Sequence, residues 1–178
     1  MLEAAYTCVA AYGIGKTTVE DVARRSGVSR ATLYRYFPGG RDQVVREVVA
    51  WQAGLFFEQL AEAVDGYADL GELLVETLLF AHRAFLDHAV LQKVLETEPE
   101  RLLPALTLQS DRVLAFVRAF LASHIRASDL RPGLEPAEAT EYLGRLLLSY
   151  IGSPGRWDLT SREEVRRLVA REFLGAVS

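Results

Sequence analysis

Polar and aromatic side chains that could contact DNA are concentrated in one short stretch, residues 29–36. An arginine can bond the O6 and N7 edge of guanine with two nitrogens, and a threonine methyl group can touch the thymine methyl. Tyrosine hydroxyls reach phosphate oxygens, and a serine at a helix start, with the first-turn amides, can meet a phosphate. The candidates are Ser29, Arg30, Thr32, Tyr34, Arg35 and Tyr36.

Two short helices joined by a tight turn must position these side chains. Thr17 with Glu20, or Thr18 with Asp21, offers a capping box for the first of the two, and Gly27 ends it. Ser29 is a natural N-cap for the second helix. Five small or apolar residues are expected to face inward and fix the crossing of the two helices. They are Val22, Ala23, Val28, Leu33 and Phe37. This pattern is typical of a helix-turn-helix, whose second helix enters the major groove of DNA.

The whole chain is predicted to be all-α. Apolar residues recur at intervals of three and four almost everywhere, whereas the period-two alternation of strands is absent. We expect about nine helices. Besides the two of the motif, they cover 2–12, about 41–64, 70–87, 89–96, 101–128, 136–152 and 161–176. Gly13 and Gly15 are expected to end the first helix, and Pro38-Gly39-Gly40 separates the motif from the long fourth helix.

The charge is divided unevenly along the 178 residues. The formal net charge of −4 argues at first against a nucleic-acid partner. Residues 1–50, however, carry seven Lys and Arg against five Asp and Glu, a net +2, which leaves −6 for the remainder. A basic head on an acidic body is expected when only one end of a protein meets phosphates.

Residues 4–50 resemble the DNA-binding domain of the TetR family of bacterial transcriptional regulators. The resemblance depends on Thr-Thr-Val-Glu-Asp-Val-Ala at 17–23, Gly-Val-Ser at 27–29 and Thr-Leu-Tyr-Arg-Tyr-Phe-Pro at 32–38. It implies a homodimer whose two recognition helices enter successive major grooves of a near-palindromic operator, about 34–36 Å apart, usually as a repressor. It also adds Thr18 to the DNA contacts and implies a C-terminal domain that dimerises through its last two helices and holds a ligand pocket. We therefore expect a DNA-binding domain over 1–46 and an effector-binding and dimerisation domain over 47–178.

The sequence departs from that family in two places. Relatives often place a phosphate-binding lysine two residues after the position of Pro38, where this chain has Gly40. We expect Arg41, or the amides of Gly39 and Gly40, to replace it. Many relatives also carry a basic arm before the first helix, and this sequence begins almost inside that helix. Either such an arm precedes these residues or minor-groove contacts are not used.

The effector site is predicted from the few polar and aromatic residues of the C-terminal helices. A ligand pocket between helices is mostly apolar, with a few polar groups that orient the ligand. Ordinary core packing is the competing interpretation for each aromatic residue. The candidates are Phe56, His82, Phe85, Phe116, Phe120, His124 and Tyr142. Because polar groups are scarce, we expect a hydrophobic or amphipathic effector.

The dimer interface is predicted on the last two helices. Apolar stripes on both helices could serve either the core of one protomer or the contact between two. The candidates are Leu143, Leu147 and Tyr150 on the first helix, and Val165, Leu168 and Phe173 on the second.

Other functions have less support in the sequence. His82 and His88 are six residues apart, so they do not share a helix face as two metal ligands would, and we expect no metal site. The sequence contains no Ser-His-Asp context, P-loop or dinucleotide motif, so we expect neither an enzyme nor a cofactor. An architectural or scaffolding DNA-binding dimer without an effector remains the alternative. A single cysteine, Cys8, excludes an internal disulfide, and no uncharged stretch approaches the ~18 residues of a membrane span. The start of the chain lacks the features of a signal peptide, so we expect a cytoplasmic protein without membrane contact.

Overall fold

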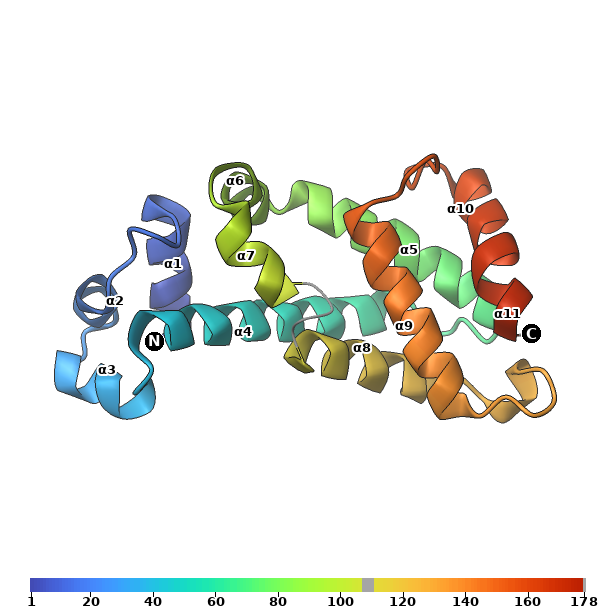
Figure 1. Cartoon of the computed structure of the whole chain (residues 1–178), viewed down its shortest axis with the longest axis horizontal. Coiled ribbons are helices and arrows are strands. Elements are labelled where there is room, and N and C mark those ends of the chain that lie inside the picture. Colours follow the sequence, from blue (N-terminus) through green and yellow to red (C-terminus); the bar gives the residue numbers. More distant parts are fainter. Residues whose placement is uncertain (107–110, 178) are drawn as a thin grey trace. The chain divides into compact units, whose positions relative to one another are not determined.

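The computed structural model describes residues 1–106 and 111–177, and this part of the chain is all-helical, as predicted (Figure 1). It divides into two compact units. Unit 1 comprises 1–55 and 88–113, and unit 2 comprises 56–87 and 114–178. The long helix α4 (Gly40–Ala63) is shared, because its first part belongs to unit 1 and its last turns to unit 2. Within the described residues, no helix is both long and apolar enough to cross a membrane.

Unit 1 begins with three short helices next to the start of α4 (Figure 1): α1 (Leu2–Tyr12), α2 (Val19–Ser26) and α3 (Arg30–Tyr36). Of the two capping boxes considered, the structure has Thr18 with Asp21. Gly27 ends α2 in the left-handed region, at φ +70°, which a side-chain-free residue adopts at little cost. Ser29 caps α3, as predicted. Local chemistry therefore sets the ends of both motif helices.

An apolar core holds these three helices against α4. Leu33 of α3 is completely buried, Phe37 is 9% exposed, and both pack with residues of α1, α2 and α4. The buried members of this core are Ala5, Cys8, Val19, Val22, Ala23, Leu33, Phe37, Val44 and Val48. Cys8 is a buried free thiol here, and burial raises the pKa of that thiol above its ordinary value. The inward-facing residues of the helix-turn-helix thus form the core, and its outward-facing residues are exposed to solvent.

The second part of unit 1 is the helix pair α6 (Ala89–Thr97) and α7 (Pro99–Leu106). Val94 and Leu102 from this pair form a buried cluster with Val9, Ile14 and Val45. Lys93 Nζ also donates to the Ala10 carbonyl at 2.8 Å. The pair is consequently attached to α1 and to the chain that follows it, although more than 80 residues separate them in sequence.

Unit 2 contains α5 (Leu70–Asp87), α8 (Asp111–His124) from Leu114 on, α9 (Pro136–Gly152) and α10 (Arg162–Leu168). The last helix continues as the π-helical turn η2 (Val169–Leu174) and α11 (Gly175–Val177). The core of unit 2 draws on all of these elements and on the end of α4. Gly144 lets α9 approach α8 closely, since a Cβ there would lie 2.9 Å from Val117 Cγ1. Arg166 of α10 donates two hydrogen bonds to Glu72 of α5, at 2.9 and 3.1 Å.

Two helix boundaries differ from the sequence prediction. The predicted helix over 101–128 corresponds to α7, which begins at Pro99, and to α8, followed by the 3-10 turn η1 (Ala127–Asp129); residues 107–110 lie outside the described part. Pro99 occupies the first position of α7, where its missing N–H costs no helical hydrogen bond. The predicted helix over 161–176 is interrupted by the π-helical turn η2.

Candidate nucleic-acid interface

The outer face of α3 carries the predicted DNA-contacting side chains. Ser29, Arg30 and Arg35 are exposed, and Thr32 is half-buried. Tyr34 is 38% exposed and Tyr36 is 56% exposed, which are high values for tyrosines on a helix whose opposite side is completely buried. The structure therefore leaves this face of α3 open, with aromatic and basic groups side by side.

Short-range contacts order this face. Ser29 Oγ accepts the Thr32 amide at 3.0 Å and lies 2.9 Å from the Thr32 hydroxyl. The Arg30 guanidinium lies 5.5 Å from the centre of the Tyr34 ring, and that of Arg35 lies 5.4 Å from the Tyr36 ring. A guanidinium over a tyrosine ring is attracted to the electron-rich face of the ring, which favours this arrangement of both side chains.

Arg30 also forms an ion pair with Glu20, with Nη1 and Oε1 2.8 Å apart. Both side chains are largely exposed, at 64% and 45%. An exposed ion pair contributes little free energy, so a phosphate or guanine could displace Glu20 readily.

Thr18 lies at the N-terminus of α2. Its hydroxyl accepts the Asp21 amide at 3.1 Å, and its own hydroxyl and amide donate to the Asp21 carboxylate. These donors hold the pKa of Asp21 below its ordinary value of 3.8. The side chain of Thr18 is thus fixed by the capping box and remains exposed.

A shallow hollow of about 350 Å³ joins part of the predicted set. Thr18, Tyr34 and Arg41 all line it. Its other lining residues are Thr17, Val19, Glu20, Gly39 and Asp42. The sequence stretches around Thr18, Tyr34 and Arg41 therefore meet in space at one side of α3.

The residues expected to replace the missing lysine already have partners within the protein. The Gly39 amide donates to Gln43 Oε1 at 2.8 Å, and the Gly40 amide donates to the Phe37 carbonyl at 2.8 Å. Arg41 donates to the Gly15 carbonyl at 3.3 Å and to Asp42 at 3.1 Å. The two amides are consequently engaged within the turn, whereas the Arg41 side chain is still 38% exposed.

Four of the seven predicted effector residues are brought together by ring contacts. Phe56, Phe116, Phe120 and His124 belong to one aromatic cluster, in which Phe120 and His124 have ring centroids 4.7 Å apart. Sequence reasoning missed Phe57, which stacks on Phe116 at 5.8 Å and contacts Phe120 at 6.0 Å. The spacing of Phe57 to the buried Leu60 and Val64, three and seven residues on, is the signal that could have identified it. The cluster comprises Phe56, Phe57, Phe80, Phe116, Phe120 and His124.

The other three effector candidates, His82, Phe85 and Tyr142, lie on α5 and α9. His82 is half-buried, and its Nδ1 is buried without a hydrogen-bond partner among the described residues. Phe85 is also half-buried on α5. Tyr142 is 39% exposed, and its hydroxyl donates to the Glu172 carbonyl at 3.1 Å, which ties α9 to η2.

The predicted dimer residues lie mainly in the interior of unit 2. The side chains of Leu143, Val165, Leu168 and Phe173 are completely buried within one chain, and Leu147 is 3% exposed. Tyr150 is half-buried, with its ring 5.7 Å from that of Phe173. The five buried positions stabilise the protomer itself, so a partner would have to contact their outward neighbours on the same helices.

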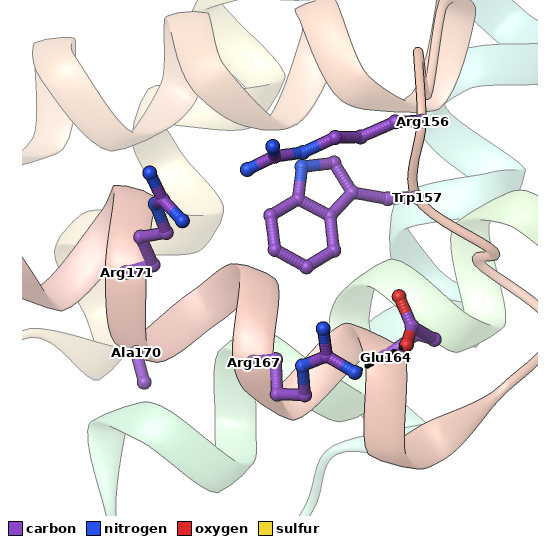
Figure 2. A pocket seen from close by; sticks show the side chains of 6 residues that line it. All are labelled: Arg156, Trp157, Glu164, Arg167, Ala170 and Arg171. Carbon is purple, nitrogen blue, oxygen red and sulfur yellow. Dashed lines mark hydrogen bonds and ion pairs between the residues drawn. The ribbon is translucent and has the colours of Figure 1, made fainter.

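A cavity of about 570 Å³ lies in unit 2, between the segment before α10 and the outer side of α10 and η2. Figure 2 shows the side chains that line it. Arg156 lies over the Trp157 ring at 4.8 Å, and Arg167 pairs with Glu164 at 2.6 Å. The lining residues are Arg156, Trp157, Glu164, Arg167, Ala170 and Arg171. None of the predicted effector residues lines it.

Comparisons with known proteins support the assignment made from the sequence. The family model for bacterial regulatory proteins of the tetR family matches residues 1–48. The model for the C-terminal domain of the bacterial tetracyclin repressor matches residues 70–171, more than half of the chain. Both units therefore contain segments characteristic of one family.

Individual relatives agree. An uncharacterised HTH-type transcriptional regulator of Mycobacterium tuberculosis, MT2310, is 49% identical over 41 residues; the match spans 23% of this chain and only 22% of that protein. Among solved structures, the TetR family repressor AlkX from Dietzia sp. aligns over 99% of this chain and 97% of its own, with a TM-score of 0.70 and 19% identity. FadR from Bacillus subtilis aligns over 96% of both chains, with a TM-score of 0.56 and 18% identity. At such identities the structural matches establish the fold. With the two family models, they show that the chain belongs to the TetR family of bacterial transcriptional regulators.

Proposed function

We propose that this regulator is a ligand-responsive repressor, which binds a palindromic operator as a homodimer and is released by a hydrophobic or amphipathic small molecule. The observation that carries the proposal is the outer face of α3. Leu33 and Phe37 hold the helix from behind, while Tyr34 and Tyr36 remain exposed in front. Such a helix is suited to enter a major groove. A regulator of this kind would act in the cytoplasm and would need no catalytic group.

Each side chain on α3 has a proposed role. Arg30 would leave Glu20 to bond a guanine edge, and Thr32 would touch a thymine methyl. The hydroxyls of Tyr34 and Tyr36 would donate to phosphate oxygens. The cap residues Thr18 and Ser29 would place helix N-termini against the DNA backbone, and Arg35 and Arg41 would add phosphate contacts.

Dimerisation would use the outward side of α9 and α10. Tyr142 is exposed and Leu146 is half-buried on α9, next to the completely buried Leu143. Arg167 of α10 and Ala170 of η2 are exposed beside the buried Leu168. A two-fold axis would bring the same outward strip of each protomer together, because isologous contacts use one surface twice.

The aromatic cluster supports an effector with an apolar chain. Five of its six rings are phenylalanine rings, and the only polar ring among the six is the His124 imidazole next to Phe120. The AlkX repressor is implicated in the biodegradation of n-alkanes, and the FadR structure from Bacillus subtilis is a complex with stearoyl-CoA. Ligands with alkyl chains are therefore the first to test here, by co-purification and mass spectrometry. Recovery of only small, highly charged metabolites would contradict this part of the proposal.

The DNA-binding part is tested by selecting operators from genomic fragments and measuring affinity by fluorescence anisotropy. Replacing Tyr36 with Ala should weaken operator binding by about tenfold, since one lost contact costs on the order of 1–3 kcal/mol. The matched control is Tyr12→Ala, because Tyr12 is equally exposed, at 53%, but lies on α1. Both variants should keep the wild-type thermal stability.

Two outcomes would contradict the proposal. Equal affinities of the Tyr36→Ala and Tyr12→Ala variants would show that the outer face of α3 does not contact DNA. Binding that depends strongly on salt but prefers no sequence would indicate an architectural DNA-binding protein instead.

A further inference from the structure

The loop that follows α1, residues 13–18, is held by a side chain 83 positions away in sequence. Glu98 lies between α6 and α7, and its Oε2 accepts the Gly15 amide at 2.6 Å. The Glu98 side chain is only 19% exposed, and Arg101 Nε lies 3.3 Å from the same carboxylate oxygen. A short bond from an amide to a partly buried carboxylate is among the stronger hydrogen bonds in proteins.

The same loop is held by apolar contacts as well. Ile14, next to Gly15, is 5% exposed and packs with Val94 of α6 and Leu102 of α7. The 13–18 loop is therefore attached to the α6–α7 pair through one apolar and one charged contact, both within unit 1.

Two glycines indicate that this close approach is specific. A Cβ on Gly13 would overlap the Glu98 carboxylate. A Cβ on Gly15 would lie 2.8 Å from Glu98 Oε2, and Gly15 is not in the left-handed region, so no backbone angle requires glycine there. The absence of a side chain at Gly15 thus serves the contact with Glu98.

From this loop, hydrogen bonds lead to the proposed DNA contacts. The Thr17 hydroxyl donates to the Gly13 carbonyl at 2.7 Å, and the Gly15 carbonyl accepts Arg41 Nη1 at 3.3 Å. Thr18, the next residue after Thr17, is the N-cap of α2. Gly15 therefore donates its amide to Glu98 and accepts Arg41 at its carbonyl.

We propose that Glu98 is a positioning residue for DNA binding, which acts through the 13–18 loop on Thr18 and Arg41. The inference depends on the proposed function, since it assigns a role in operator binding to a residue outside the helix-turn-helix. It has a regulatory consequence. Any displacement of α6 and α7 that breaks the bond from Gly15 to Glu98 lowers operator affinity, and operator binding in turn favours the intact bond, because coupling between two sites is reciprocal.

The test compares three substitutions at or near this position. Glu98→Ala removes the acceptor, whereas Glu98→Gln keeps an oxygen at the same distance from the Gly15 amide. Glu100→Ala is the matched control, because Glu100 is a neighbouring carboxylate, 70% exposed, that lies 3.8 Å from the same arginine. Operator affinity is measured by anisotropy, and amide exchange of residues 13–18 by mass spectrometry.

We expect Glu98→Ala to weaken operator binding by about tenfold and to accelerate exchange of the Gly15 amide, in line with the loss of one bond to a charged group. Glu98→Gln should restore most of the affinity, and Glu100→Ala should match the wild type in both measurements. Should the alanine variant fold poorly, Glu98→Asp supplies the same test, because the shorter side chain withdraws the carboxylate while keeping its charge.

Wild-type affinity in a Glu98→Ala variant whose Gly15 amide exchanges faster would overturn the positioning role alone. Unchanged exchange of that amide would overturn the contact itself, and this readout requires no operator. Failure of the wild-type protein to select any operator would instead contradict the proposed function.

Discussion

Gly27 provides a sharp test of how the helix-turn-helix is built. It ends α2 at φ +70°, and a Cβ built there would meet no heavy atom within 4 Å. The only unfavourable contribution to the folded state of an alanine at this position would therefore be the left-handed backbone conformation. The left-handed region costs a residue with a side chain about 1–2 kcal/mol. Alanine also restricts the unfolded chain, which offsets about 0.5–1 kcal/mol of that cost. The net loss for Gly27→Ala should be about 1 kcal/mol, or a fall in the midpoint of thermal unfolding of about 2–4 °C.

Two other glycines serve as controls, because they show whether the loss at Gly27 comes from its left-handed backbone or from any change of glycine to alanine. Gly133 is also left-handed, at φ +86°, with open space around it, so Gly133→Ala should show a similar loss. Gly152 lies at the end of α9 with open space but an ordinary φ, so Gly152→Ala should be neutral or stabilising by up to about 1 kcal/mol. The assay is urea and thermal unfolding followed by far-ultraviolet circular dichroism, at one protomer concentration. The reasoning would be refuted if Gly27→Ala and Gly152→Ala changed the stability by the same amount.

Two further predictions concern unit 2. Gly144→Ala should lower the free energy of unfolding in urea by about 1–3 kcal/mol, although alanine favours helix more than glycine, because the new Cβ would overlap Val117. Adding Val117→Ala in the same chain should recover part of that loss. If the losses of the two single variants simply added in the double variant, the contact would be contradicted. The hydrogen bond from Arg166 holds the pKa of Glu72 below its ordinary value of 4.5, so its contribution to stability is present above pH 4.5 and is lost as the pH falls through the lower pKa of the folded state. Arg166→Gln should therefore lower stability near neutral pH more than at about pH 3 in urea titrations; an equal loss at both would contradict the pairing.

The parts of the fold that were predictable from the sequence depend on local chemistry. Ser29 caps α3 with its own hydroxyl, and Gly27 ends α2 in the left-handed region. Leu33 and Phe37, four residues apart on one helix face, are buried as the pattern indicates. These features need only a few neighbouring residues, so a single sequence contains them.

Contacts between distant residues were not accessible in the same way. The sequence predicts Gly13 and Gly15 alike as helix stops, but only Gly13 caps α1, at φ +84°. Gly15 instead allows Glu98 to approach, and no periodicity connects positions 83 residues apart. Similarly, the stripe containing Leu143 and Leu147 on α9 is compatible with a protomer core or a dimer contact, and only packing shows that it fills the core.

The end of the chain shows how the spacing of apolar residues can signal an irregular helix. Val165, Val169, Phe173 and Val177 follow one another at constant intervals of four and are all buried, with exposures between 0% and 2%. On a regular α-helix, with 3.6 residues per turn, a step of four drifts by roughly 40°, so three steps would carry Val177 about 120° away from the side of Val165. A π-helical turn contains more residues per turn and removes this drift. The turn η2 spans Val169–Leu174, within this series, and it keeps all four side chains in the core. Leu168, three residues after Val165, is also completely buried, so the interval of four stands without a buried neighbour at three only from Val169 to Val177, which is where the π-helical turn lies.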